Sequence, residues 1–318
     1  MLNSKDVFEV VIPLRLNPLL KGVHILDLDI AQEAFKLPGI FDFEDVKVAF
    51  FSAGKKDVLT FRHLHIDGIH RLFTAVKEIE GKFTGLNLQM SDVKLEDADA
   101  SFHISLDNDY GLHSLKGVLT ASALDYDTLM MTYLRSDVVG DSRQIRLEDF
   151  VVNFSGGVLQ GQILLDYQPK LAYSIKLIMN NVDLNAMGET HPEIFAHIQG
   201  TIEGKMNIEG DEESFHSIAA AFDAPQGGQI RAFLLKHLVE YLPANSTERL
   251  QLQDIIRQGG YVKLEVADGE IHSADAEHLS GRLHLLSQTY NLDITYPVDI
   301  YVEGGLVHVF DAFHAIAQ

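Results

Sequence analysis

A strict alternation of apolar and polar residues between Ile198 and Ile208 is the feature that most constrains the fold of this chain. The segment reads I-Q-G-T-I-E-G-K-M-N-I, and one set of alternate positions is apolar or glycine: Ile198, Gly200, Ile202, Gly204, Met206 and Ile208. The other set is polar: Gln199, Thr201, Glu203, Lys205 and Asn207. A period of two without a slip predicts a β-strand with one wet face and one dry face.

The same alternation recurs along the chain between short turns that contain glycine or proline. We predict strands at Val7–Leu16, Val23–Ile30, Val46–Phe51, Val58–Ile66, Phe83–Met90, Val93–Leu95, Ala100–Leu106, Ser114–Ala121, Ile145–Phe154, Val158–Tyr167, Leu171–Met179, Ile198–Glu209, Ser217–Asp223, Tyr261–Val266, Gly269–Ser273, Arg282–Ser287, Asn291–Val302 and Leu306–Phe310. Consecutive strands joined by short turns are typical of an antiparallel meander.

Helical spacing of apolar residues is confined to a few segments. Ile230–Leu242 is predicted to be helical and to stop at Pro243, and a second helix is predicted to start with Ser246 as its cap. We also predict a helix over Tyr126–Leu134, and either a short helix or a strand over Arg71–Ile79. The expected fold is therefore mainly β, with a short helical insertion near residues 230–258.

Composition excludes several classes of partner and site. The chain has 318 residues and a net charge of −21, which argues against nucleic acid and against flat adsorption on an anionic membrane. It has no cysteine, so disulfides and thiolate metal sites are excluded. No stretch reaches the roughly 18 apolar residues of a membrane span, and the first residues do not read as a signal peptide. The repeat pattern leads us to expect the soluble part of a longer, exported chain.

The predicted strands are too many, and the predicted helices too few, for helices to cover the apolar face. Leaving that face wet would cost about 25 cal/mol per Å². A second sheet, closure into a barrel, or a ligand with apolar surface could cover it. The aliphatic side chains on this face are spaced by glycine and alanine, and tryptophan is absent. This favours a long curled antiparallel sheet, a groove or half-pipe, that is occupied by a ligand.

Three segments resemble the C-terminal region of AsmA-like proteins. They are Gly156–Gly161, which starts a strand with two glycines, the turn Asn181–Leu184, and the strand Ile198–Gly204. The resemblance spans roughly Ile145 to Phe310. It implies a bacterial lipid-transfer protein of the periplasm, anchored in the inner membrane, with a curled sheet whose apolar groove moves phospholipid toward the outer membrane.

Motifs of catalysis or metal binding are weak. His63 and His65 would share a face of a strand, as two metal ligands need, but no Asp, Glu or His downstream is spaced to complete a site. The turn Asp107–Gly111 resembles the start of a calcium loop without the downstream glutamate. Phosphate loops and a nucleophile elbow are absent, and 46 acidic residues nominate no acid pair for a polysaccharide-acting enzyme. We expect no enzyme, no cofactor and no metal site.

These observations favour a protein that holds phospholipid or other acyl-chain lipids, for transport between the membranes of the bacterial envelope, with membrane or envelope proteins as possible partners. We expect an N-terminal β region at 1–144, continuous with the same sheet, and an AsmA-like β-groove region at 145–318. The residues predicted to line the groove are Leu159, Ile163, Leu165, Leu171, Ile175, Leu177, Ile202, Met206, Ile208, Ile294 and Ile300. The alternative is a ligand-free β-sandwich or barrel that serves as an envelope assembly or adhesion module.

Overall fold

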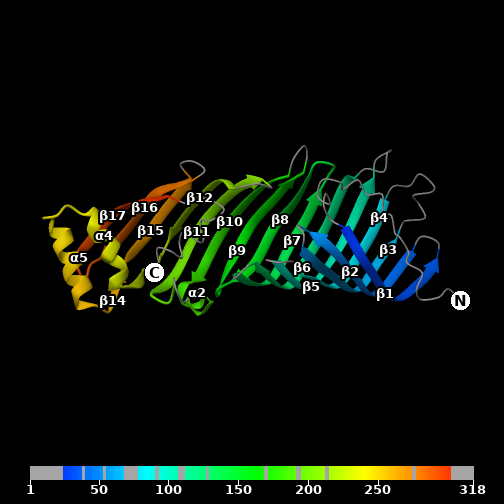
Figure 1. Ribbon diagram of the computed structural model, residues 1–318, viewed down its shortest axis with the longest axis horizontal. Helices are drawn as coiled ribbons and strands as arrows, with labels where there is room; N and C mark the ends of the chain where they lie inside the picture. Colours follow the sequence, from blue (N-terminus) through cyan, green and yellow to red (C-terminus); the bar gives the residue numbers. More distant parts are fainter. Residues whose placement is uncertain are drawn as a thin grey trace. The chain divides into compact units, whose positions relative to one another are not determined.

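The computed structural model describes residues 24–37, 40–52, 55–67, 78–89, 93–106, 112–126, 129–167, 171–190, 195–211, 215–273 and 277–301. Strands dominate the described residues (Figure 1). The strands are β1 His24–Leu37, β2 Ile40–Ser52, β3 Lys55–Asp67, β4 Glu78–Gln89, β5 Val93–Leu106, β6 Leu112–Tyr126, β7 Leu129–Gly140, β8 Gln144–Phe154, β9 Gly157–Asp166, β10 Ala172–Asp183, β11 Ile198–Asp211, β12 Phe215–Asp223, β13 Gly228–Arg231, β14 Tyr261–Leu264, β15 Val266–Ser273, β16 His278–Ser287 and β17 Leu292–Tyr301. The helices are α2 Leu184–Thr190, the 3₁₀ helix η1 Ala232–Leu235, α4 Lys236–Tyr241 and α5 Thr247–Gln258.

The chain divides into two compact units. Unit 1 comprises Met1–Val151 and Leu164–Leu171, and unit 2 comprises Val152–Ile163 and Ala172–Gln318. Strands β8 and β9 therefore contribute residues to both units.

In unit 1 each strand from β1 to β7 pairs antiparallel with the next strand in the chain. The side chains of Leu86, Ala98, Ala121 and Leu134 are buried in this ladder, and the Phe61 and Phe83 rings meet edge to face at 5.4 Å. The β4–β5 register shifts on both sides of Leu86. Bulges of this kind bend strands and raise their local twist.

Polar side chains hold this irregularity in place. Gly85 has a φ of 63°, and its N–H donates to Asp99 Oδ1 at 2.9 Å. Asp97, with a φ of 49°, donates its N–H to Asn87 Oδ1 at 2.9 Å and forms an ion pair with Arg62. A Cβ on Gly85 would require the exposed Arg62 side chain to move, and the positive φ of Gly85 would strain any other residue.

Unit 2 is built in the same antiparallel way, with two exceptions to chain order. β10 pairs with β11, β11 with β12, β15 with β16, and β16 with β17. β12 pairs with β15 across the helical insertion. The start of β11 pairs instead with β13, and β13 pairs with β14.

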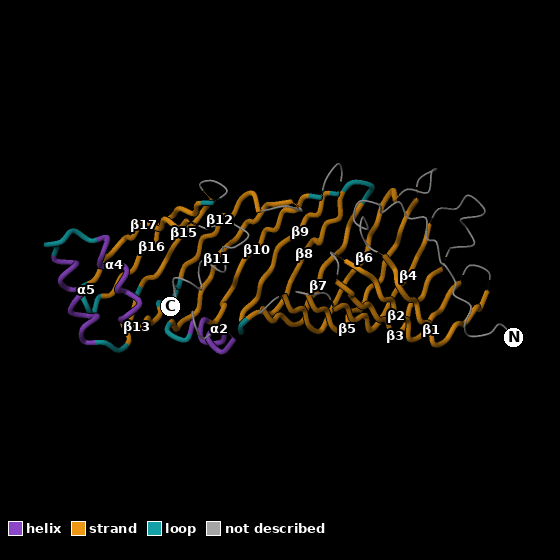
Figure 2. Tube along the Cα trace, in the orientation of Figure 1, coloured by secondary structure: helices purple, strands orange, loops and turns teal. Residues whose placement is uncertain are grey.

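The helical insertion forms the main buried cluster of unit 2. Figure 2 shows η1, α4 and α5 gathered beside the last strands, and α5 contacts β17. The buried members of the cluster are Ala232, Leu235, Leu238, Val239, Leu252, Ile255, Val262, Leu264, Leu285, Leu292 and Ile294. Within the described ranges, no helix has the length and apolar character needed to cross a membrane.

The structure confirms a mainly β, antiparallel fold with a short helical insertion. Ser246 caps α5 as predicted, since its hydroxyl accepts the N–H of Arg249 at 3.1 Å. The predicted strands Val93–Leu95 and Ala100–Leu106 are one strand, β5. The predicted helix Tyr126–Leu134 is wrong, because these residues end β6 and begin β7.

Several predictions concern residues that are not described. The strands Val7–Leu16 and Leu306–Phe310 and the turn Asp107–Gly111 lie outside the described residues, as does most of Arg71–Ile79.

Candidate functional site

The strand register of unit 2 assembles the apolar faces of six strands into adjoining rows. The pairing gives the residues that lie opposite one another on β10, β11, β12, β15, β16 and β17. A row is the set of opposite residues, one from each strand, so it runs across the strands. The central row is Leu177, Met206, Ala220, Ile271, Gly281 and Val298. The row on one side is Met179, Gly204, Phe222, Gly269, Leu283 and Tyr296. On the other side, paired apolar residues include Ile175, Ile208, Ile218, Leu279 and Ile300.

We call this surface the apolar face of unit 2. All six residues of its central row are only partly buried. Two glycines of the neighbouring row are overlaid by side chains: the Phe222 ring lies against Gly269, and Met179 Cε lies against Gly204. The face therefore combines aliphatic and aromatic side chains with glycines, and its central row retains exposure that a closed core would remove.

The opposite face of the same strands is polar. Arg282 Nε donates to Glu270 Oε1 at 2.9 Å across β15 and β16. His284 lies between two carboxylates, with Nδ1 at 2.8 Å from Asp268 Oδ2 and Nε2 at 3.1 Å from Asp293 Oδ1. Hydrogen bonds that the His284 ring donates to these two carboxylates raise the pKa of His284 above its usual value of 6.5.

We expect His284→Gln to remove a pH-dependent part of the stability. Because the folded pKa is raised, the contribution of His284 is fully present below pH 6.5 and is lost as the pH rises through the folded pKa. The difference in unfolding free energy between wild type and variant should therefore shrink with rising pH, as measured by urea unfolding. His272→Gln on neighbouring β15 is the control. A difference that stays constant or grows with pH would contradict the pairing.

The helical insertion covers one end of the apolar face. Leu285 and Ile294 are opposite residues on β16 and β17 and belong to the buried cluster, while Leu283 and Tyr296, the next pair on that face, pack against it only in part. On the other side of the central row, Ile218 and Leu279 are also buried, so the partly exposed part of the face is the central row between them.

The predicted groove residues fall into three groups. Ile175, Leu177, Ile202, Met206 and Ile208 lie together on β10 and β11 and are partly buried, with Ile175 opposite Ile208 and Leu177 opposite Met206.

Leu159 and Ile163 are partly buried residues of β9 on either side of Gly161, whose backbone lies against Leu177. Leu165 and Leu171 belong to unit 1, outside the rows of unit 2.

The last two predicted residues lie on β17. Ile300 pairs with Leu279 at the end of this strand. Ile294 is 4% exposed and packs among the residues of the helical cluster, so it contacts protein.

Sequence reasoning did not select several residues of the central row. Ala220, Ile271 and Val298 have the correct parity in their strands: Ala220 lies between two alanines, Ile271 between Glu270 and His272, and Val298 between Pro297 and Asp299. The alternation within the predicted strands indicates that these three residues lie on the apolar face. Their position in the same row as Met206 follows only from the register between strands.

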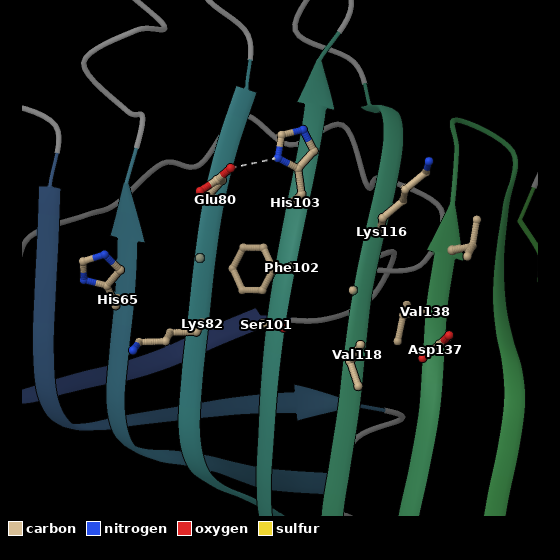
Figure 3. Close-up of a pocket in the computed structure, with 13 residues that line it drawn as sticks. His65, Glu80, Lys82, Ser101, Phe102, His103, Lys116, Val118, Asp137 and Val138 are labelled. Carbon is tan, nitrogen blue, oxygen red and sulfur yellow. Dashed lines mark ion pairs between the residues drawn. The ribbon is translucent and has the colours of Figure 1, made fainter.

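Unit 1 carries a hollow of about 730 Å³ on the polar face of β3 to β7 (Figure 3). Two rows of side chains border it. The first row is His65, Lys82, Ser101, Val118 and Asp137. The second row is Glu80, His103, Lys116 and Val139. Gly81, Phe102, Gly117 and Val138 complete its lining, and the Phe102 ring lies in the middle of this view. Glu80 Oε1 lies 3.5 Å from His103 Nδ1. Because both signs of charge are mixed here, the hollow selects no class of ion.

The described residues contain no group of three or more His, Asp or Glu side chains that could hold a metal ion. His63 and His65 stack with ring centroids 6.5 Å apart. Comparison with known proteins adds no identity: no family model, curated protein or solved structure matches the chain.

Proposed function

We propose that the apolar face of unit 2 binds the acyl chains of phospholipid or a similar lipid and shields them from water. The observation that supports this most directly is the central row, in which Leu177, Met206, Ala220, Ile271, Gly281 and Val298 adjoin one another and all keep partial exposure. Burial of an acyl chain on such a surface contributes about 0.8 kcal/mol per CH₂ group.

The dimensions of the face suit an acyl chain. Six strands about 4.8 Å apart give a row of about 24 Å. One leaflet of a bilayer is about 15 Å of hydrocarbon, half of the core thickness of about 30 Å. One chain of ordinary length can therefore lie across the strands along the central row.

The polar face and the net charge of −21 keep the lipid-bound protein in solution, which a carrier between two membranes requires. The resemblance to AsmA-like proteins favours the periplasm of the bacterial envelope as its place of action. In this proposal the lipid passes between the envelope membranes on the protein, without chemical change.

Two adjacent alanines on β12 allow a matched test. Ala220 lies on the apolar face between Met206 and Ile271, and Ala219 lies on the polar face between Asn207 and His272. Ala220→Asp is expected to abolish lipid co-purification, measured by organic extraction and mass spectrometry, because a carboxylate beside the acyl chain loses its hydration. Ala219→Asp introduces the same charge and should retain the lipid.

Circular dichroism and urea unfolding establish that both variants fold. If Ala220→Asp unfolds, Met206→Gln, which keeps the length of the side chain without adding charge, replaces it. Retention of lipid by a folded Ala220→Asp protein would contradict the proposal. So would wild-type protein that carries no lipid and takes none from phosphatidylethanolamine vesicles. Unfolding of both apolar-face variants would favour the closed-core alternative.

A further inference from the structure

A second hollow in unit 2 lies where β11 changes its partner. Residues from Glu203 onward pair with β12, whereas Ile198–Gly200 pair with β13. Between β12 and β13 the chain makes a turn in which Gly227 N–H donates to the Ala224 carbonyl at 2.8 Å. This break in the ladder leaves a cavity of about 300 Å³ on the polar face, with Gly200, Gly227 and Gly228 in its lining.

The side chains around this cavity are mostly neutral amides and a hydroxyl. The register places Gln199 opposite Gln229, Gln229 opposite Lys263, and Thr201 opposite Asp183. Gln226 and Asn185 complete the polar lining. We call this site the amide pocket.

Most of these polar groups are available to a ligand. Among the described residues, the side chains of Gln199, Thr201, Gln226 and Gln229 make no hydrogen bond to protein, although Gln199 and Thr201 are partly buried. The Asp183 carboxylate is already engaged, since its Oδ1 accepts from the Asn185 backbone N–H at 2.8 Å and side-chain amide at 2.9 Å. Gln226 and Gln229 are exposed, so the amides of the pocket can form hydrogen bonds to a ligand that enters it.

Two aromatic contacts involve residues near the amide pocket in the chain, although none of these residues is part of its lining. The Arg231 guanidinium lies 4.2 Å from the centroid of the Tyr261 ring, one pair beyond Gln229 and Lys263 in the β13–β14 register. The next aromatic contact is between His197 and Phe233, whose ring centroids are 4.9 Å apart, and Phe233 is 49% exposed. Rings of this kind present flat apolar surface.

We propose that the amide pocket binds a neutral saccharide. Each sugar hydroxyl both donates and accepts hydrogen bonds, and side-chain amides and the Thr201 hydroxyl offer both in return. One lysine and one engaged carboxylate give no net preference for an ion. The glycines let a sugar ring approach the backbone. This site lies on the face opposite the acyl-binding surface and does not depend on it.

Saturation-transfer NMR on the full chain tests the proposal, with glucose, N-acetylglucosamine and inorganic phosphate as probes. At least one sugar is expected to bind in the millimolar range, and a variant with both Gln199→Ala and Gln229→Ala should weaken it at least tenfold. Gln258→Ala, an exposed glutamine at the end of α5, is the matched control and should bind as wild type.

Three results would overturn the saccharide assignment. The first is that neither sugar binds the wild-type protein. The second is that binding persists in the folded double variant, which would place the sugar elsewhere. The third is that phosphate binds and is lost in Lys263→Gln, which would make the pocket an anion site. If the double variant does not fold, Gln229→Ala alone, at an exposed position, replaces it.

Discussion

Leu252→Ala is expected to lower the free energy of unfolding by about 2–5 kcal/mol. Leu252 is 0% exposed on α5, and it belongs to the buried cluster that joins the helices to β14, β16 and β17. Removal of its side chain forfeits the burial of three carbons and leaves a cavity that the surrounding strands can fill only in part. The change should appear as a lower urea midpoint with an unchanged m-value.

Leu250→Ala provides the control two residues away on the same helix. Leu250 is 57% exposed, and surface substitutions of this kind change stability by about 0.5 kcal/mol or less. Equal losses from both variants would show that α5 does not pack on the sheet through its Leu252 side. A drop in m-value for Leu252→Ala would show that the helices unfold separately from the strands.

Gly281→Ala is expected to have the second large effect, at least about 3 kcal/mol, the upper end of ordinary overpacking. A Cβ on Gly281 would stand 1.9 Å from the Glu270 carbonyl oxygen and 2.8 Å from the Cα of Ile271. These are backbone atoms of the paired strand β15, so no rotamer change relieves the clash. β15 and β16 would have to separate at the middle of their ladder.

Gly260→Ala is the matched control for this prediction. Gly260 has a φ of 82°, and a Cβ there would meet nothing within 4 Å. Its substitution should therefore cost only the left-handed backbone strain, about 1–2 kcal/mol. Thermal and urea unfolding measure the loss of stability in each variant. The loss comes from a steric clash in Gly281→Ala and from backbone strain in Gly260→Ala. A Gly281→Ala protein as stable as Gly260→Ala would contradict the close approach of β15 and β16.

The sequence predicted which residues of a strand share a face, and the register of β10, β11 and β17 agrees with that prediction. It failed at Tyr126–Leu134 because Tyr133 has a φ of 55° and is 73% exposed, so burial passes from Met131 directly to Leu134. That spacing of three, after two adjacent apolar residues, imitates a helix. Which face a residue lies on depends on alternation along its own strand. One residue of unusual backbone conformation therefore moves all the following side chains to the opposite face.

The candidate site could be predicted only in part, because a row depends on register between strands. Ile175 and Ile208 were each predicted to lie on a dry face, but nothing in the sequence placed them opposite one another. The pairing of Ala220 with Ile271 joins strands separated by the whole helical insertion. The partial exposure of the central row also depends on which residues pack above it. The alternation of apolar and polar residues within a strand does not predict those contacts.

The pairing of each strand with its chain neighbour has a consequence for how the protein is made. In unit 1 every ladder from β1 to β7 closes across a short connection, so the loop-closure entropy of each step is small. A sheet of this kind has a low contact order, unlike most all-β folds. Each strand from β2 to β7 therefore pairs with a strand that precedes it in the chain, so the ladder of unit 1 can form in the order of synthesis.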